Sequence, residues 1–365
     1  MTVTFEHVTL GQRVLFGAGK AAAHLSAEVG RLGAGRVMVI AGSSEAPLVE
    51  KLCAGIDVVL YYNDVAPHVP VGKAEKARAA ALAHGIDLVV CVGGGSTTGL
   101  AKAIALTTHL PIIAVPTTYA GSEATNVWGL TEASRKTTGV DDHVLPVSVI
   151  YDAELTLSLP AGLSVASGLN ALAHCIDSMW APRADPINQA LAAEGIRALA
   201  GGLPLIKHNP QDLAGREQAL YGAYLSAVAF ASAGSGMHHK ICHVLGGAYN
   251  MPHAETHAVV LPHVLAYNAP FAPDAERRIA AALGTADAVA GLEALRSVLA
   301  APTALKDHGL AEAAIPQAVE LILPAIPGSN PRPVSAMELE HLLRAAYVGT
   351  TPAAPSMPRK ESSHA

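Results

Sequence analysis

The segment DLVVCVGGGSTTGLAKAIALTTHLPIIAVPTT, residues 87–118, decides the fold class of this 365-residue chain. Two short apolar runs rich in β-branched residues, Asp87–Val92 and Pro111–Val115, flank an alanine-rich stretch, Gly99–Thr107, that is typical of a helix. Strands that are apolar along their whole length are buried on both faces, as in a parallel sheet covered by helices. The segment therefore predicts a strand–helix–strand unit of an α/β domain.

The same alternation extends toward the N-terminus, with strands expected at Arg36–Ala41 and Asp57–Tyr61 and a helix at Lys73–Gly85. Beyond about Leu155, strand-like runs disappear and helical periodicity continues, over residues 166–181, 186–202, 211–232, 234–247, 274–300 and 335–347. Ser335 and Glu338 form a capping-box pattern at the last of these. We therefore expect a parallel-sheet, dinucleotide-binding α/β domain over residues 1–153, an all-α domain over 154–350 and a disordered tail over 351–365.

Composition excludes several classes of protein. A hydrophobic content of 51% with 15% charged residues is typical of a globular chain, and a net charge of −6 argues against binding to nucleic acid. Apolar runs are too short to span a membrane, and the N-terminal residues lack the apolar core of a signal peptide. Four cysteines without CxxC spacing suit free thiols in a reducing compartment. We expect a cytoplasmic enzyme with neither a nucleic-acid nor a membrane partner.

Two segments favour a dinucleotide site. Gly93, Gly94, Gly95 and Ser96 lie between a predicted strand and helix, where free N–H groups and the helix dipole attract phosphate. The spacing is not GxGxxG, and a tight turn without a ligand is an equal alternative. Thr117 and Thr118 follow the next strand, where open α/β sheets bind ligands, although such hydroxyls can also cap helices.

The strand Arg36–Ala41 bears on the choice of cofactor. NAD-specific folds often carry Asp or Glu at this strand end, where it binds the ribose 2′-hydroxyl. Here the strand is followed by Gly42-Ser43-Ser44, so a 2′-phosphate would meet no carboxylate. We therefore expect either NADH or NADPH to serve.

Histidines are concentrated in GMHHKICHVLGGAYNMPHAETH, residues 236–257. His239 and His243 are four residues apart and therefore share a helix face, as do Asn170 and His174 upstream. His253 follows Pro252 and is expected in a loop. Imidazoles that converge from separate elements are typical of a first-row metal site, although any one of them could equally be a hydrogen-bonded structural residue. An amide stands where such a site would carry a carboxylate.

These motifs resemble those of the group III, iron-containing alcohol dehydrogenases. The resemblance rests on VGGGS, PTT, the helix around Asn170 and the HxxxHxLGxxxxxPH stretch, and it covers about residues 10–347. In that family an Asp and three His bind Fe²⁺ or Zn²⁺ on a dehydroquinate synthase-like architecture. The resemblance places Asn170 at the Asp, His174, His239 and His253 at the metal histidines, and His243 near the reacting carbons.

The departures from that family resemble one of its branches, the maleylacetate reductases. Gly99 stands where metal-dependent members usually carry Asp, and Asn170 replaces the metal carboxylate; HHKICHVLGG, TYAGSEAT and NPRPVS are also similar to this branch. The resemblance implies NADH- or NADPH-dependent reduction of the C=C bond of maleylacetate, a small dicarboxylate, to 3-oxoadipate in bacterial degradation of aromatic compounds. It also implies a cytoplasmic homodimer that needs no metal.

Roles for the site residues follow from this chemistry. We expect His243 and His253 to stabilise or protonate the enolate that hydride addition creates. Asn170, His174 and His239 would line the pocket and hold the substrate carboxylates, because a histidine pocket without its carboxylate becomes more electropositive. His238 and His257 are interpreted as structural, and Lys136 as either a contact to the cofactor ribose or a solvated surface charge.

Three alternatives remain open on the sequence. The histidines could still hold Zn²⁺ in a metal-dependent alcohol or polyol dehydrogenase. A dehydroquinate synthase-like lyase would need a metal carboxylate and a basic cluster for a substrate phosphate, neither of which is evident. A non-catalytic nucleotide-binding module would leave His239, His243 and His253 unexplained.

Overall fold

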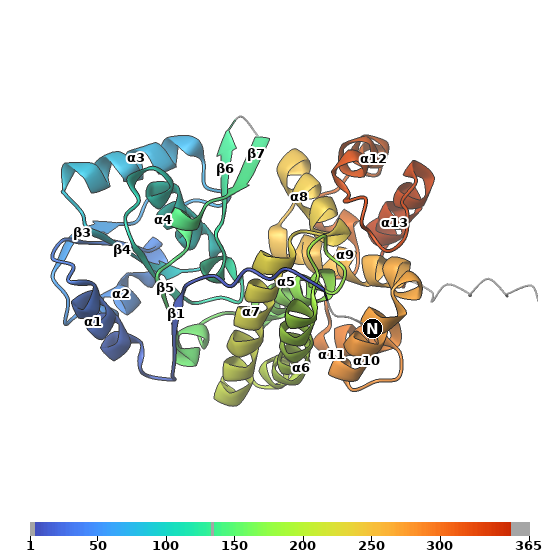
Figure 1. Ribbon diagram of the computed structural model, residues 1–365, viewed down its shortest axis with the longest axis horizontal. Coiled ribbons are helices and arrows are strands. Elements are labelled where there is room, and N and C mark those ends of the chain that lie inside the picture. The colour runs from blue at the N-terminus through green and yellow to red at the C-terminus, as the bar shows by residue number, and fades with distance from the viewer. Residues whose placement is uncertain (1–3, 133–134, 352–365) are drawn as a thin grey trace, which may run out of the picture.

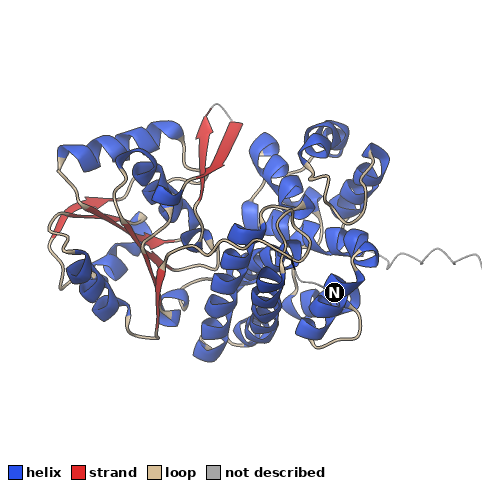
Figure 2. Ribbon diagram, viewed as in Figure 1, coloured by secondary structure: helices blue, strands red, loops and turns tan. Residues whose placement is uncertain are grey.

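The computed structural model describes residues 4–132 and 135–351, without the side chains of Arg135 and Lys136. Its N-terminal half contains a parallel sheet of six strands in the order β1-β8-β5-β4-β2-β3 (Figures 1 and 2). The strands are β1 Arg13–Phe16, β2 Val37–Ile40, β3 Val58–Tyr62, β4 Leu88–Gly93, β5 Ile112–Pro116 and β8 Ser148–Tyr151. All four strands expected from the sequence are present, and the parallel α/β fold is confirmed.

Helices cover both faces of this sheet, which explains its continuous apolar strands. Alternate side chains such as Val39 and Val90 pack toward α1 (Ala21–Leu32) and α2 (Ala46–Leu52). Their neighbours Met38 and Cys91 pack toward α3 (Val71–Ala83) and α4 (Gly95–Thr108). The helix α4 begins earlier than the sequence pattern indicated, because the glycine-rich segment itself forms its first turn.

The second half is helical, as expected. Its helices are α5 Ala161–Ser178, α6 Pro186–His208, α7 Leu213–Ala233, α8 Met237–Tyr249, α9 His253–Asn268, α10 Pro273–Leu283, α11 Ala288–Leu299, α12 Ile315–Ile322 and α13 Ala336–Val348. The capping box of Ser335 and Glu338 starts α13. The boundary expected after residue 153 falls in a short 3-10 helix, Ala153–Thr156, and the tail from residue 352 lies outside the described residues.

Two expectations about the helical half are wrong. His253 does not lie in a loop but is the first residue of α9, because Pro252 has the extended backbone of an N-cap. Proline is tolerated at the start of a helix. Because Pro252 precedes α9 and Pro262 lies within it, the sequence pattern did not predict this helix. The single helix expected over 274–300 is two helices: Gly284 adopts φ of 73° after α10, and Asp287 caps α11.

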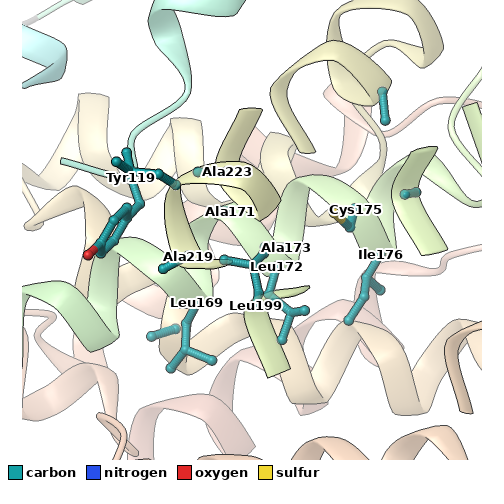
Figure 3. Close-up of a cluster of buried hydrophobic side chains, with 14 of the residues drawn as sticks. Tyr119, Leu169, Ala171, Leu172, Ala173, Cys175, Ile176, Leu199, Ala219 and Ala223 are labelled. Carbon is teal, nitrogen blue, oxygen red and sulfur yellow. The ribbon is translucent and has the colours of Figure 1, made fainter. Parts of the chain in front are cut away.

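Two features join the halves. An antiparallel hairpin of β6 (Val127–Glu132) and β7 (Arg135–Val140) extends beside α8 (Figure 1). Tyr119, in the segment after β5, packs its ring against α5 and α7 (Figure 3), and its hydroxyl accepts a hydrogen bond from the fully buried Arg216 at 3.1 Å. Within the described chain, no helix combines the length and apolarity needed to cross a membrane.

Candidate active site

The glycine-rich segment and the segment after β5 meet at the carboxyl edge of the sheet. Gly93 pairs with Pro116, so the two segments begin at the same level. Gly94 caps α4 without a side-chain hydrogen bond, and a Cβ added there would lie 3.0 Å from the methyl carbon of Thr118. The hydroxyl of Thr118 is buried and has no hydrogen-bond partner among the residues that the structure describes. Backbone N–H groups at a helix start beside an open hydroxyl fit a phosphate.

This arrangement brings most of the expected cofactor residues together, namely Gly93, Gly94, Gly95, Ser96, Thr117 and Thr118. Lys136 lies in β7 opposite Thr131, but its side chain is outside the described part of the chain, so its role stays a prediction. Gly99 lies in α4, where a Cβ would come within 2.8 Å of Val69, so this position has no room for a larger side chain.

The segment after β5 also reaches the histidines. A Cβ on Gly121 would lie 3.7 Å from Nδ1 of His174 and 2.9 Å from Ala227. Gly121 adopts φ of 79°, a left-handed conformation that favours glycine. One short segment therefore connects the glycine-rich turn at Thr118 to the histidines, an arrangement that would suit a dinucleotide bound along this edge of the sheet.

Three helices supply a cluster of histidines. The rings of His174 (α5) and His239 (α8) stack, with centroids 4.8 Å apart and planes inclined by 15°. His243 lies one turn further along α8, 6.0 Å from His239 between centroids. His253, at the start of α9, lies near the same group, 4.4 Å from the ring of His257. The histidines singled out in the sequence thus come together in space.

The exposure of these side chains separates them into two groups, called here the floor (Asn170, His174 and His239) and the rim (His243 and His253). Asn170, His174 and His239 are buried, with 2%, 8% and 1% of their surface exposed. His243 is half-buried and His253 is exposed. The rim residues are therefore open to solvent, whereas the floor residues are largely withdrawn from it.

A buried carboxylate that the sequence interpretation missed lies under this floor. Asp177 Oδ2 accepts hydrogen bonds from Nδ1 of His239 at 2.7 Å and from the N–H of Gly236 at 2.8 Å. A Cβ on Gly236 would lie 2.4 Å from the other carboxylate oxygen, so only glycine permits this approach. Asp177 follows His174 by three residues and Asn170 by seven, on the same helix face, and this spacing was the available signal.

Burial sets the charges of these groups. It raises the pKa of Asp177 to about 7, against the lowering effect of the backbone N–H groups of Gly236, His239 and His238. It lowers the pKa of His174 to about 3 and that of His239 well below its usual value. Burial therefore favours neutral imidazoles at the floor, beside a buried acid, and any positive charge there has to be acquired when an anion binds.

His238 and His257 form a pair behind the pocket. Nε2 of His238 lies 2.9 Å from Nδ1 of His257, and the sulfur of Cys242 lies 3.7 Å from His238. In the described chain these three residues are the one group of His, Cys, Asp or Glu whose ligand atoms lie within 4.8 Å of one another. The two rings already bond to each other, and burial raises the pKa of Cys242 well above its usual value, which disfavours the thiolate that a metal needs.

The residues at the metal positions of the resembled family do not fit a cation well. The ligand atoms of His174, His239 and His253 do not form a group within 4.8 Å in the described chain. The position of the family's carboxylate is occupied by Asn170, whose Oδ1 is buried and has no hydrogen-bond partner in the described part of the chain. Imidazole is a good ligand for a first-row metal, but a neutral amide oxygen offsets none of the cation's charge, so this set should bind a divalent cation less tightly than one that includes a carboxylate.

The neutral buried histidines predict a stability that depends on pH. Histidine in the unfolded chain has a pKa of about 6.5, whereas these folded rings bind a proton only at a lower pH. Below about pH 6.5 unfolding is therefore accompanied by proton uptake, and the free energy of unfolding falls as the pH falls. His174 and His238, with pKa values of about 3, act in this direction, and His239 and His257 do so too. Asp177, with its raised pKa, opposes them between about pH 4 and 7.

From pH 7 to pH 5 we expect the free energy of unfolding to fall by on the order of 5 kcal/mol, as urea denaturation at the two pH values would measure. Equal stability at both would contradict neutral rings in the folded state.

Comparison with known proteins agrees with this architecture. Residues 11–153 match the family model described as iron-containing alcohol dehydrogenase, and residues 164–347 match that of the Fe-containing alcohol dehydrogenase family, C-terminal. A maleylacetate reductase from Delftia acidovorans is 45% identical over 96% of this chain and 99% of its own length.

Among solved structures, an iron-containing alcohol dehydrogenase from Corynebacterium glutamicum is 61% identical, with a TM-score of 0.94 over 96% of this chain and 98% of its own. A maleylacetate reductase from a Rhizobium species is 42% identical, with a TM-score of 0.90 over 96% and 99% of the two chains.

Proposed function

This chain belongs to the iron-containing alcohol dehydrogenase family, and we propose that within it the protein is an NAD(P)H-dependent oxidoreductase that reduces the C=C bond of maleylacetate to 3-oxoadipate. The observation that carries this proposal is Asn170 on the floor of the histidine pocket, where a metal-binding carboxylate would otherwise lie. Full-length similarity to maleylacetate reductases supports it. We further propose a cytoplasmic homodimer that acts in the degradation of aromatic compounds.

Reduction of the C=C bond creates negative charge on the substrate, which the site must stabilise. Hydride from the nicotinamide adds to the alkene carbon β to the ketone, the π electrons of the C=C bond move to form a new double bond to the carbonyl carbon, and the carbonyl π pair moves to its oxygen, which gives an enolate. A proton then adds to the α carbon, and the cofactor leaves oxidised. Without a cation, hydrogen-bond donors must stabilise the enolate oxygen.

We assign stabilisation of the enolate to the two rim histidines, His243 and His253. His243 and His253 are accessible, and a histidine in water can carry or release a proton near neutral pH. His243 and His253 therefore stabilise the enolate and supply the proton in our proposal. Their closeness to the buried rings, 6.0 Å from His239 and 4.4 Å from His257 between centroids, keeps them at the pocket.

The floor binds the substrate. His174 can donate from Nδ1, which has no hydrogen-bond partner among the described residues, and the amide group of Asn170 would have to present its N–H groups to the carboxylate. His239 donates Nδ1–H to Asp177, so its Nε2 can bind an anionic oxygen only after taking up a proton. A substrate carboxylate on one side and Asp177 on the other would both stabilise that charged ring, so protonation of His239 accompanies binding of the dianion.

The experiment that tests this proposal is maleylacetate reduction after exhaustive chelation. We expect full NADH oxidation by protein whose metal content has been measured as negligible, and no increase when Zn²⁺ or Fe²⁺ is added, because no step of the mechanism uses a cation. Activity that disappears on chelation and returns with metal would instead support the second candidate, a metal-dependent alcohol or polyol dehydrogenase. That candidate is favoured by the Asp177–His239 hydrogen bond, which is common behind metal ligands.

Asn170→Asp is the matched control for this experiment. It restores the carboxylate at nearly constant volume, so the variant should bind Zn²⁺ more tightly than the wild type, by at least about tenfold. Its new negative charge should also weaken binding of the maleylacetate dianion. A variant that gains no metal affinity would show that the amide is not what excludes the metal.

A further inference from the structure

A carboxylate lies at the end of β2 although none follows that strand directly in the sequence. Residues Ser43–Glu45 form a 3-10 turn, in which the N–H of Glu45 donates to the carbonyl of Gly42 at 3.1 Å. The turn folds the side chain of Glu45 back over the strand end, so that a Cβ on Gly42 would lie only 2.5 Å from its Oε2. The hydroxyl of Ser44 donates to the same oxygen at 2.8 Å and holds it there.

The strand end that carries this carboxylate lies next to the glycine-rich turn. The strands β2 and β4 are neighbours, and Ile40 pairs with Cys91, so Gly42 is level with Gly93. Neighbouring strands are about 4.8 Å apart. Side chains alternate along β2, and Ile40 packs on the side of α3 and α4, so the Cβ position of Gly42, two residues on, turns to that same side. The helix α4 starts on this side, at Gly95.

The other face of the strand end holds a second acid. A cavity of about 650 Å³ lies between α2 and the sheet, bordered by Gly42 and Ser43, and Glu50 lies at it. Glu50 is exposed and faces this cavity on the α2 side, whereas Glu45 does not line it. The two carboxylates therefore lie on different sides of Gly42, and Glu45 is the one on the side where α4 presents its N-terminus.

We infer that Glu45 binds the adenosine ribose of the cofactor and makes the enzyme prefer NADH over NADPH. The inference rests on the proposed nicotinamide-dependent reduction. In a dinucleotide the ribose is directly bonded to the pyrophosphate, so a phosphate held at Gly94–Ser96 places the ribose near the adjacent strand end. A carboxylate there accepts hydrogen bonds from the 2′- and 3′-hydroxyls and repels a 2′-phosphate. This inference replaces the expectation that NADH and NADPH serve equally.

The test is the affinity of each protein for NADH and for NADPH, measured without substrate by the change in nicotinamide fluorescence. Wild-type protein should bind NADH more tightly than NADPH by about tenfold or more. Glu45→Gln keeps the length of the side chain but removes its charge. It should reduce that ratio by at least about tenfold, mainly because NADPH binds better.

Glu50→Gln is the matched control, since it removes an equal charge from the other side of Gly42 and should leave the ratio within about twofold. The melting temperatures of both variants check that they are folded. If Glu45→Gln leaves the ratio of NADH to NADPH affinity unchanged, or if Glu50→Gln reduces it equally, the assignment of Glu45 is wrong. Reduction of maleylacetate by the wild type would in that case still support the proposed function. A wild-type protein that binds neither cofactor would overturn both.

Discussion

Replacing His243 or His253 with alanine is expected to lower kcat for maleylacetate reduction by about 10²–10⁴-fold, the usual contribution of a positioned acid. Both rings lie at the accessible rim of the pocket, where the enolate oxygen and the α carbon must be reached. His243→Gln and His253→Gln should lose as much as the alanine variants, because an amide preserves shape but cannot transfer a proton. Steady-state kinetics with NADH at saturating maleylacetate provides the measurement.

The control for the rim histidines is His208→Ala. His208 is exposed at the end of α6, and its removal should leave kcat within about twofold. Losses below tenfold in both rim variants would contradict their assigned roles. If His253→Ala lost bound metal together with activity, the metal-dependent dehydrogenase would be favoured instead, so metal content should be measured on every variant.

Replacing Asp177 with alanine is expected to destabilise the protein by about 2–5 kcal/mol, because it leaves two buried donors without their acceptor, at about 1–3 kcal/mol each. The groups concerned are the N–H of Gly236, which holds the start of α8, and Nδ1 of His239. The free energy of unfolding from urea titration measures this loss. Activity should also fall at temperatures where the variant is folded, because His239 is no longer oriented or able to share charge with the acid.

Asp177→Asn separates charge from packing. Its amide oxygen can accept both hydrogen bonds that Oδ2 now accepts, so the loss of stability should be smaller, about 1–3 kcal/mol for the buried amide hydrogens. Its KM for maleylacetate should nevertheless rise, since a neutral partner no longer favours the protonated His239 that binds the dianion. Asp212→Ala, which removes the N-cap of α7, is the control: it should cost about 1 kcal/mol and leave KM unchanged. An unchanged KM in Asp177→Asn would restrict Asp177 to a structural role.

Local patterns were sufficient for much of this protein. Continuous apolar strands indicated a sheet buried on both faces, and the i, i+4 spacings of Asn170 with His174 and of His239 with His243 placed each pair on one helix face. Errors occurred where local signals were ambiguous. Pro252 begins α9 although a proline often ends helical structure, and Gly95 starts α4 although glycine usually belongs to a turn.

The amino-acid sequence by itself determined the α/β and helical halves, the glycine-rich turn after β4 and the helix faces that carry the histidine pairs, because each depends on patterns within a few residues. Only the tertiary structure decided the chemical character of the site. Asp177 and His239 are 62 residues apart, and their hydrogen bond exists because α5 and α8 pack together. The neutrality of the floor likewise follows from exclusion of water, a property of the whole packed pocket, and the carboxylate of Glu45 reaches Gly42 only through the turn that follows β2.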